Sequence, residues 1–199
     1  MLTESQVYSL HQKYSHGIYK DQILDLVWTH SCIVKEISLK IANNLVDKYC
    51  LNTDLNLLTV GALIHDLGFY SCFDDNFKKL HKYFLHGELG YRIVLKEKLP
   101  ETLARFCSTH IGIGVSPNIP ITTEEEIVTY ADCFHSKGHP SFSTYSEIED
   151  EVSKFSQDNL IILKRFQDKF DLPDLSKLEI KYRSWHQQIN QWLDSLKTV

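Results

Sequence analysis

The sequence has few residues that interrupt helices, and it lacks the patterns that mark membranes or secretion. Eight glycines and five prolines occur among 199 residues, so few positions demand a turn. No apolar run approaches the roughly 18 residues that a membrane-spanning helix needs. The N-terminal residues do not show the charged-then-apolar pattern of a signal peptide. We therefore expect no membrane partner and a cytoplasmic location.

Paired cysteines and an excess of positive charge are also lacking. The five cysteines are odd in number, scattered, and free of any CxxC pair, which favours reduced thiols over disulfides. With 21 basic against 26 acidic residues, the net charge is −5. A protein that binds nucleic acid through its backbone needs a clustered basic surface. No nucleic-acid polymer is therefore expected as a partner.

Helical periodicity is what the sequence does contain. Between Lys20 and Cys50, apolar residues recur every three or four positions, as on one stripe of an amphipathic helix. Other helices are predicted at 54–64, at 86–98, from Pro100 onward, from Thr123 through Lys137 with Glu126 closing a capping box, at about 145–170, and from Leu178 to Leu196. No stretch alternates with period two for long enough to need a sheet. The prediction is a single all-α domain over 1–199, a bundle of about seven main helices.

The stripe of the last helix has two interpretations. Its apolar and aromatic positions include Tyr182, Trp185 and Trp192. They suit packing on the rest of the bundle, which we favour, and they equally suit the face of a homodimer.

Several polar residues occupy positions where a core leucine is expected. His30 falls on the apolar stripe of the long helix. His110 comes after the inward-facing residues of the helix that begins at Pro100, and Asp132 lies four residues after Val128. The segment GALIHDLGFY ends an apolar run with the adjacent His65 and Asp66, after which Gly68 is expected to end the helix. A buried carboxylate without a partner is costly, so it should be paired or bind a metal. Together these residues suggest one shared metal site.

The order His30, His65-Asp66, Asp132 resembles the HD-domain superfamily of metal-dependent phosphohydrolases. The resemblance covers about residues 25–137, with the helices at 145–197 then packing on that core. "LIHDLG" and "YADCFHSK" look most like segments of small stand-alone bacterial HD proteins. The resemblance implies an α-helical bundle around the metal ligands.

Carried over residue by residue, the resemblance implies a ligand set. His30, His65, Asp66 and Asp132 would bind a first metal. Members with two metals add two further histidines, for which His86 and His110 are suitably placed, with Asp66 bridging the ions. Mn, Fe, Co, Ni, Zn or Mg all remain open as the metal, and so does the choice between one ion and two.

The sequence departs from two subfamilies. Cyclic-dinucleotide phosphodiesterases with an HD-GYP signature have a lysine three residues after the aspartate, where this chain has Phe69. Guanosine tetraphosphate hydrolases have an acidic pair soon after their His-Asp, and this chain lacks it. Neither specific activity is expected here.

The chemistry expected of such a site is hydrolysis of a phosphate ester or anhydride by a metal-held hydroxide, on a small molecule such as a nucleotide. Asp66 would act with the metal. Lys137 and Arg92 are candidates to hold the phosphate, and His135 to orient Asp132 or act as an acid. No separate organic cofactor site is predicted. Two other functions stay open: a nucleotide or metal sensor without turnover, and an oxygenase that uses paired iron.

Overall fold

The computed structural model describes residues 2–49, 53–80, 85–113 and 118–197. Within these ranges the elements, in chain order, are α1 (Glu4–Tyr14), α2 (Lys20–Tyr49), α3 (Leu55–Ile64), η1 (Leu67–Cys72), α4 (His86–Lys96), α5 (Glu101–Thr109), η3 (Ile111–Ile113), α6 (Thr123–Asp132), β1 (His135–Ser136), β2 (Ser141–Phe142), α7 (Tyr145–Ser153), α8 (Gln157–Phe170) and α9 (Ser176–Leu196). Among the described elements, the only sheet is the antiparallel pair of β1 and β2. The predicted all-α class is confirmed.

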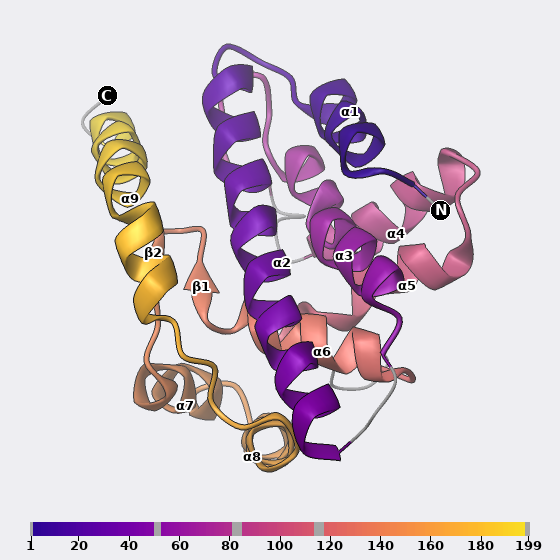
Figure 1. The fold of residues 1–199 in the computed structure, drawn as a ribbon. Helices are drawn as coiled ribbons and strands as arrows, with labels where there is room; N and C mark the ends of the chain where they lie inside the picture. Colours follow the sequence, from indigo (N-terminus) through magenta and orange to yellow (C-terminus); the bar gives the residue numbers. More distant parts are fainter. Residues whose placement is uncertain (1, 50–52, 81–84, 114–117, 198–199) are drawn as a thin grey trace.

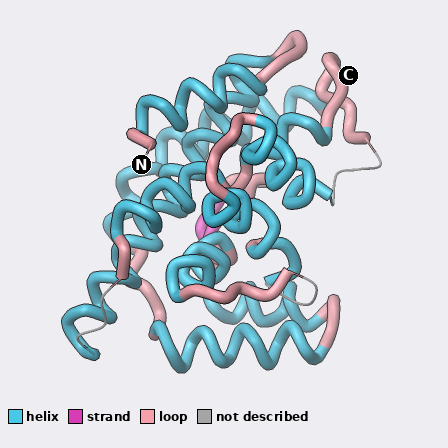
Figure 2. The backbone as a smooth tube through the Cα atoms, turned by 90° about the vertical axis from the view of Figure 1, so that its right-hand side faces the viewer, coloured by secondary structure: helices cyan, strands magenta, loops and turns pink. Residues whose placement is uncertain are grey.

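The long helix α2 is the axis around which the other helices gather (Figure 1). It packs against α3 and α6, while α4 packs against α5 and η1. In Figure 1, α1 and α3–α5 lie on one side of α2, and α7–α9 with the small sheet lie on the other. Figure 2, turned by 90°, shows the same arrangement as helices joined mostly by short loops.

The core follows the apolar stripe predicted for the long helix. Val27, Val34, Ile37 and Ile41 are fully buried along α2. The whole second half of α3 is buried because this helix lies between α2, α5 and α6. Apolar side chains removed from water on this scale supply the main stabilisation of such a bundle.

Several predicted helix boundaries are wrong. The N-cap of α6 is Thr122, whose side chain accepts a hydrogen bond from the backbone of Glu125, so the expected Thr123–Glu126 pair is shifted by one residue. The helix ends at Asp132 rather than continuing to Lys137, because β1 begins at His135. The predicted helix at 145–170 is two helices, since Ser156 caps the start of α8.

The N-terminal helix α1 was not predicted, and one histidine joins it to α3. His11 is fully buried. Its Nε2 donates to the carbonyl of Leu63 at 2.8 Å, and its Nδ1 accepts from the hydroxyl of Tyr70 at 2.9 Å. The carbonyls in the last turn of a helix lack partners within the helix. His11 therefore satisfies one of them, two residues before His65.

Three further expectations concern the cysteines, membrane spans and the packing of the last helix. Cys32, Cys72, Cys107 and Cys133 carry free thiols, and Cys50 lies outside the described residues. Across the described ranges, no helix combines the length and apolar character needed to cross a bilayer. On α9, Tyr182, Trp185 and Trp192 are partly buried against the core, as the packing interpretation of its stripe requires.

Candidate metal centre

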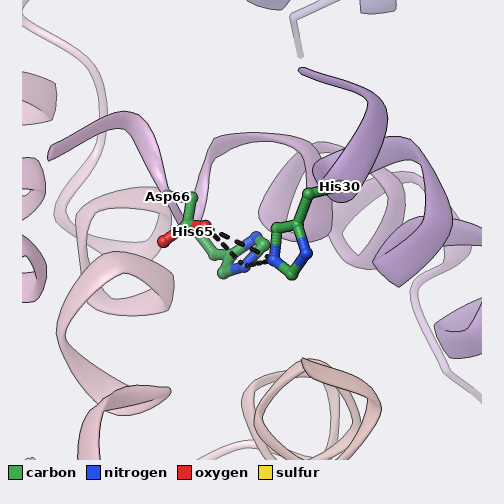
Figure 3. A group of neighbouring side chains, drawn as sticks. All are labelled: His30, His65 and Asp66. Atoms are coloured by element: carbon green, nitrogen blue, oxygen red, sulfur yellow. Dashed lines mark hydrogen bonds and ion pairs between the residues drawn. The ribbon is translucent and has the colours of Figure 1, made fainter. Parts of the chain in front are cut away.

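Two helix ends and one helix interior bring four polar residues of the core together. His30 lies within α2, His65 is the C-cap of α3, Asp66 follows it directly, and Asp132 is the last residue of α6. His30, His65 and Asp66 are fully buried, and the side chain of Asp132 is 18% exposed. Figure 3 shows His30 reaching from its helix toward the adjacent His65 and Asp66.

The first set of donor atoms is spaced like the ligands of one ion. Nε2 of His30 lies 3.3 Å from Oδ2 of Asp66, 3.0 Å from Oδ1 of Asp132 and 3.3 Å from Nε2 of His65. Nε2 of His65 lies 3.7 Å and 3.4 Å from the same two oxygens. Two ligands each ~2.1 Å from one ion lie roughly 3.0–3.4 Å apart at octahedral or tetrahedral angles. Four of the five distances fall in that range, and the fifth, 3.7 Å between His65 and Asp66, lies above it.

A second set forms on the other oxygen of Asp66. Its Oδ1 lies 3.5 Å from Nε2 of His86 and 3.5 Å from Nε2 of His110, and the two imidazole nitrogens are 3.1 Å apart. His86 opens α4, and His110 is the C-cap of α5. Asp66 thus turns one oxygen toward each set. A carboxylate that bridges two ions would need this arrangement, and the bridging role expected of Asp66 stays a prediction.

The hydrogen-bond partners of these rings leave the inward nitrogens available to a cation. His65 donates from Nδ1 to the carbonyl of Ala62 at 2.7 Å, and His110 donates from Nδ1 to the carbonyl of Phe106 at 3.2 Å. In each ring, Nε2 then faces the cluster. Both oxygens of Asp66 and Oδ1 of Asp132 are buried without a hydrogen bond among the described residues. Buried acceptors that face one another need a cation between them, so the site fits a divalent metal.

The charges of the cluster are strongly coupled. Burial alone would raise the pKa of Asp66 and Asp132, yet Lys137 and the surrounding histidines outweigh it and hold both well below the usual value. Burial would likewise lower the pKa of His65, but the two carboxylates raise it. Both carboxylates therefore stay ionised at neutral pH, as metal ligands must be.

Lys137 lies within 4 Å of three of the four residues of the first set. Its Nζ is 2.6 Å from Oδ2 of Asp66, 3.9 Å from Oδ1 of Asp132 and 3.2 Å from Nε2 of His30. The contact with Asp66 is an ion pair and not an aligned hydrogen bond. In the absence of a metal, the ammonium supplies positive charge to the same donor atoms.

The other predicted catalytic residues lie differently. His135 was expected on the helical face of Asp132, but it begins β1, and its Nδ1 meets Nδ1 of His30 at 2.8 Å. It therefore contacts a metal ligand other than the one predicted. Arg92 is exposed on α4 and pairs with Glu88, so its predicted contact with phosphate stays a prediction.

Gly68 is required by close packing and not by the end of a helix. The helix α3 already ends at Ile64, and Gly68 lies within η1. A Cβ at this position would come within 2.0 Å of the carbonyl oxygen of His86 and 2.3 Å of the backbone nitrogen of Gly90. The missing side chain lets the His65-Asp66 segment approach α4, which brings the two sets of donors together.

One residue beside the site gave no signal in the sequence. Nε2 of His186, on α9, lies 3.0 Å from Nε2 of His135. The two histidines are 51 positions apart, and only the fold reveals their contact.

Fold and site together define a class of protein: a helical domain that gathers imidazoles and carboxylates into a buried centre that could hold a divalent metal. The model of the HD domain family matches residues 27–137, a range that contains all six predicted ligands. The chain belongs to this family, part of a superfamily of metal-dependent phosphohydrolases.

Curated relatives share modest identity with the chain. It is 22% identical to a tRNA (cytidine(56)-2'-O)-methyltransferase of Picrophilus torridus, over 83% of this chain and 42% of that protein. It is 28% identical to the enzyme of the same name from Thermoplasma volcanium, over 58% of this chain and 33% of that protein. An uncharacterized protein of Methanocaldococcus jannaschii is 28% identical, over 71% of this chain and 82% of its own length. The chain spans less than half the length of either methyltransferase. No solved structure matches.

Proposed function

We propose that this chain is a phosphohydrolase that uses divalent metal to cleave a phosphate ester or anhydride of a small molecule. One observation carries the proposal: the two oxygens of Asp66 face two separate sets of donors, each spaced like the ligands of one ion. Such paired sites favour displacement at phosphorus, because two ions steady both the attacking and the leaving oxygen.

The metal, the carboxylates and the lysine would have different roles in this reaction. When bound, divalent metal supplies Lewis acidity and lowers the pKa of water at the site. Asp66 and Asp132 contribute the negative charge that holds cations in a buried place. Lys137 has its ammonium among the same donor atoms, within reach of a phosphoryl oxygen that enters the centre. Its positive charge would offset the charge that develops on that oxygen.

A cavity beside the centre provides room for the organic part of a substrate. Its volume is about 270 Å³, and its lining includes His135, Ile148, Val152 and Phe155. Apolar walls with a few polar groups are typical of sites for small molecules. Nucleotides are therefore the first substrates to test. The methyltransferase activity named for two relatives is not proposed, because the similarity covers a minority of those proteins.

The test begins with protein purified without chelator, measured for metal content and for phosphate release from a panel of phosphorylated compounds. We expect Mn, Co, Ni, Zn or Fe with phosphate release, and loss of both in His65→Ala and Asp66→Ala. The matched control is Asp75→Ala, which removes an exposed carboxylate paired with His16 and should change neither.

Two outcomes would contradict the proposal in favour of the other functions. Iron together with oxygen consumption and no phosphate release identifies an oxygenase. Bound metal and bound nucleotide with no turnover identifies a sensor.

A further inference from the structure

A line of three imidazoles runs from the metal centre to the surface. Nδ1 of His30 lies 2.8 Å from Nδ1 of His135, and Nε2 of His135 lies 3.0 Å from Nε2 of His186. His30 and His135 are buried, and His186 is partly buried on α9. His186 lies outside residues 27–137, the range that matches the family. The C-terminal helix thus contacts the centre through a route that the family match does not include.

The direction of these hydrogen bonds is fixed at the inner end. Nε2 of His30 faces the donor set and the ammonium of Lys137 at 3.2 Å. A metal needs a lone pair, so Nε2 of His30 must be unprotonated when an ion is bound, whereas in the metal-free centre this nitrogen lies 3.0 Å from Oδ1 of Asp132, which only accepts. With an ion bound, the proton of this ring is on Nδ1, which donates to His135.

The proton on Nδ1 of His30 in turn determines which nitrogen is protonated in the next two rings. Nδ1 of His135 accepts, so its own proton is on Nε2, and that nitrogen donates to Nε2 of His186. His186 is therefore the acceptor that ends the line, with its proton on Nδ1.

The outer ring is itself held in place. His186 stacks on His135 with an interplanar angle of 24°, and Phe142 meets it edge-on. It opens on a surface groove of about 460 Å³ whose lining includes Arg183 and Asn190. A fixed ring presents its acceptor nitrogen to His135 in one orientation.

We propose that His186 is a positioning residue for the metal centre. Through His135 it holds His30 in the tautomer and ring orientation that present Nε2 to the ion. This inference rests on the metal site of the proposed function and is independent of which substrate is cleaved. Partners of ligating histidines in the outer shell typically affect metal affinity by 10- to 100-fold. An acceptor one ring further out should have a smaller effect of the same sign.

The first measurement uses ¹⁵N-labelled wild-type protein loaded with Zn²⁺ and long-range ¹H–¹⁵N spectra of the histidine rings at neutral pH. We expect protons on Nδ1 of His30, Nε2 of His135 and Nδ1 of His186. A proton on Nδ1 of His135 would overturn the inference. Because no substrate is present, this result is separate from any failure of the protein to hydrolyse phosphate compounds.

The second measurement is titration with Co²⁺, followed by its visible absorption. His186→Phe keeps the ring packing but removes the acceptor, and we expect about 3- to 10-fold weaker binding with an altered spectrum. His186→Gln offers an amide oxygen near the position of Nε2 and should restore the wild-type values. Gln187→Ala, exposed on the same helix, is the matched control and should match wild type.

A merely structural role predicts a different pattern. Wild-type affinity and spectrum in His186→Phe, or no rescue by His186→Gln in a folded protein, would overturn the inference. Thermal unfolding of each variant distinguishes loss of the fold from loss of the acceptor.

Discussion

Lys137 is a cation placed where a metal ion is expected, so the two should compete. Its ammonium lies 2.6 Å from Oδ2 of Asp66. Lys137→Met removes that ion pair and leaves two buried carboxylates facing each other, which favours a bound ion. We expect the dissociation constant for Mn²⁺ to fall about tenfold, equivalent to ~1.4 kcal/mol.

Calorimetric titration measures this effect. Lys13→Met serves as the control, since Lys13 is an exposed lysine that pairs with Glu97 on the surface. Weaker Mn²⁺ binding in Lys137→Met would show that the lysine supports the ion instead of competing with it.

His11 should make stability depend on pH. Burial lowers its pKa from 6.5 to about 4, so the unfolded chain binds the proton more readily than the folded chain. The contribution of a buried neutral histidine to the free energy of unfolding is fully present above pH 6.5 and is lost as pH falls from 6.5 toward 4. For this residue alone, the loss in the free energy of unfolding from about pH 7.5 to about pH 5 is about 2 kcal/mol.

Urea unfolding with chelator present, for wild type and His11→Gln, isolates that contribution because the other histidines titrate in both proteins. The difference in stability between the two should shrink at acidic pH by about 2 kcal/mol. The same pH dependence in both proteins would show that His11 is not held neutral.

At the scale of the element, the contact between η1 and α4 depends on Gly68. A Cβ there would meet backbone atoms of His86 and Gly90, which cannot turn aside as a side chain can. We expect Gly68→Ala to lower the free energy of unfolding by about 3 kcal/mol and to reduce metal binding at His86 and His110 first. Gly138→Ala is the control, because no atom lies within 4 Å of a Cβ at that position.

Urea unfolding together with metal content measures both effects. If Gly68→Ala keeps wild-type stability and metal content, the close approach is not required.

What the sequence could predict of these elements follows from where each signal lies. The stripe of α2 and the misplaced polarity of His30, His110 and Asp132 are local patterns, and they identified helices and inward-facing residues. The end of α6 could not be predicted, because the residues after Asp132 keep an acceptable helical composition, and it is the pairing of β1 with β2 that ends the helix. His135 consequently points to His30 and not along the face of Asp132.

At the scale of the whole molecule, contacts between segments that are distant in the sequence could not be predicted. His11 meets Leu63 across 52 positions, and His186 meets His135 across 51. Neither pair has a spacing rule that could reveal it. The ligand set itself was predictable only because a known family shares its order, since periodicity shows which residues face inward but not which of them meet.

Metal should stabilise the whole fold, because its ligands come from α2, α3, α6 and the starts or ends of α4 and α5. At a free concentration of about 100 times the dissociation constant, the gain is about 2.7 kcal/mol. For a chain of this size that raises the melting temperature by roughly 5–10 °C. Calorimetry with Mn²⁺ or with chelator measures it, and an unchanged melting temperature in the presence of bound metal would contradict this linkage.

Metal content per chain, measured on wild type, His86→Ala and Asp66→Ala after equilibration with Mn²⁺ and removal of free metal, tests the central claim most directly. The bridging role of Asp66 predicts two ions in wild type, one in His86→Ala, and none in Asp66→Ala. Wild-type metal content in folded Asp66→Ala would contradict the claim that this carboxylate joins the two halves of one centre.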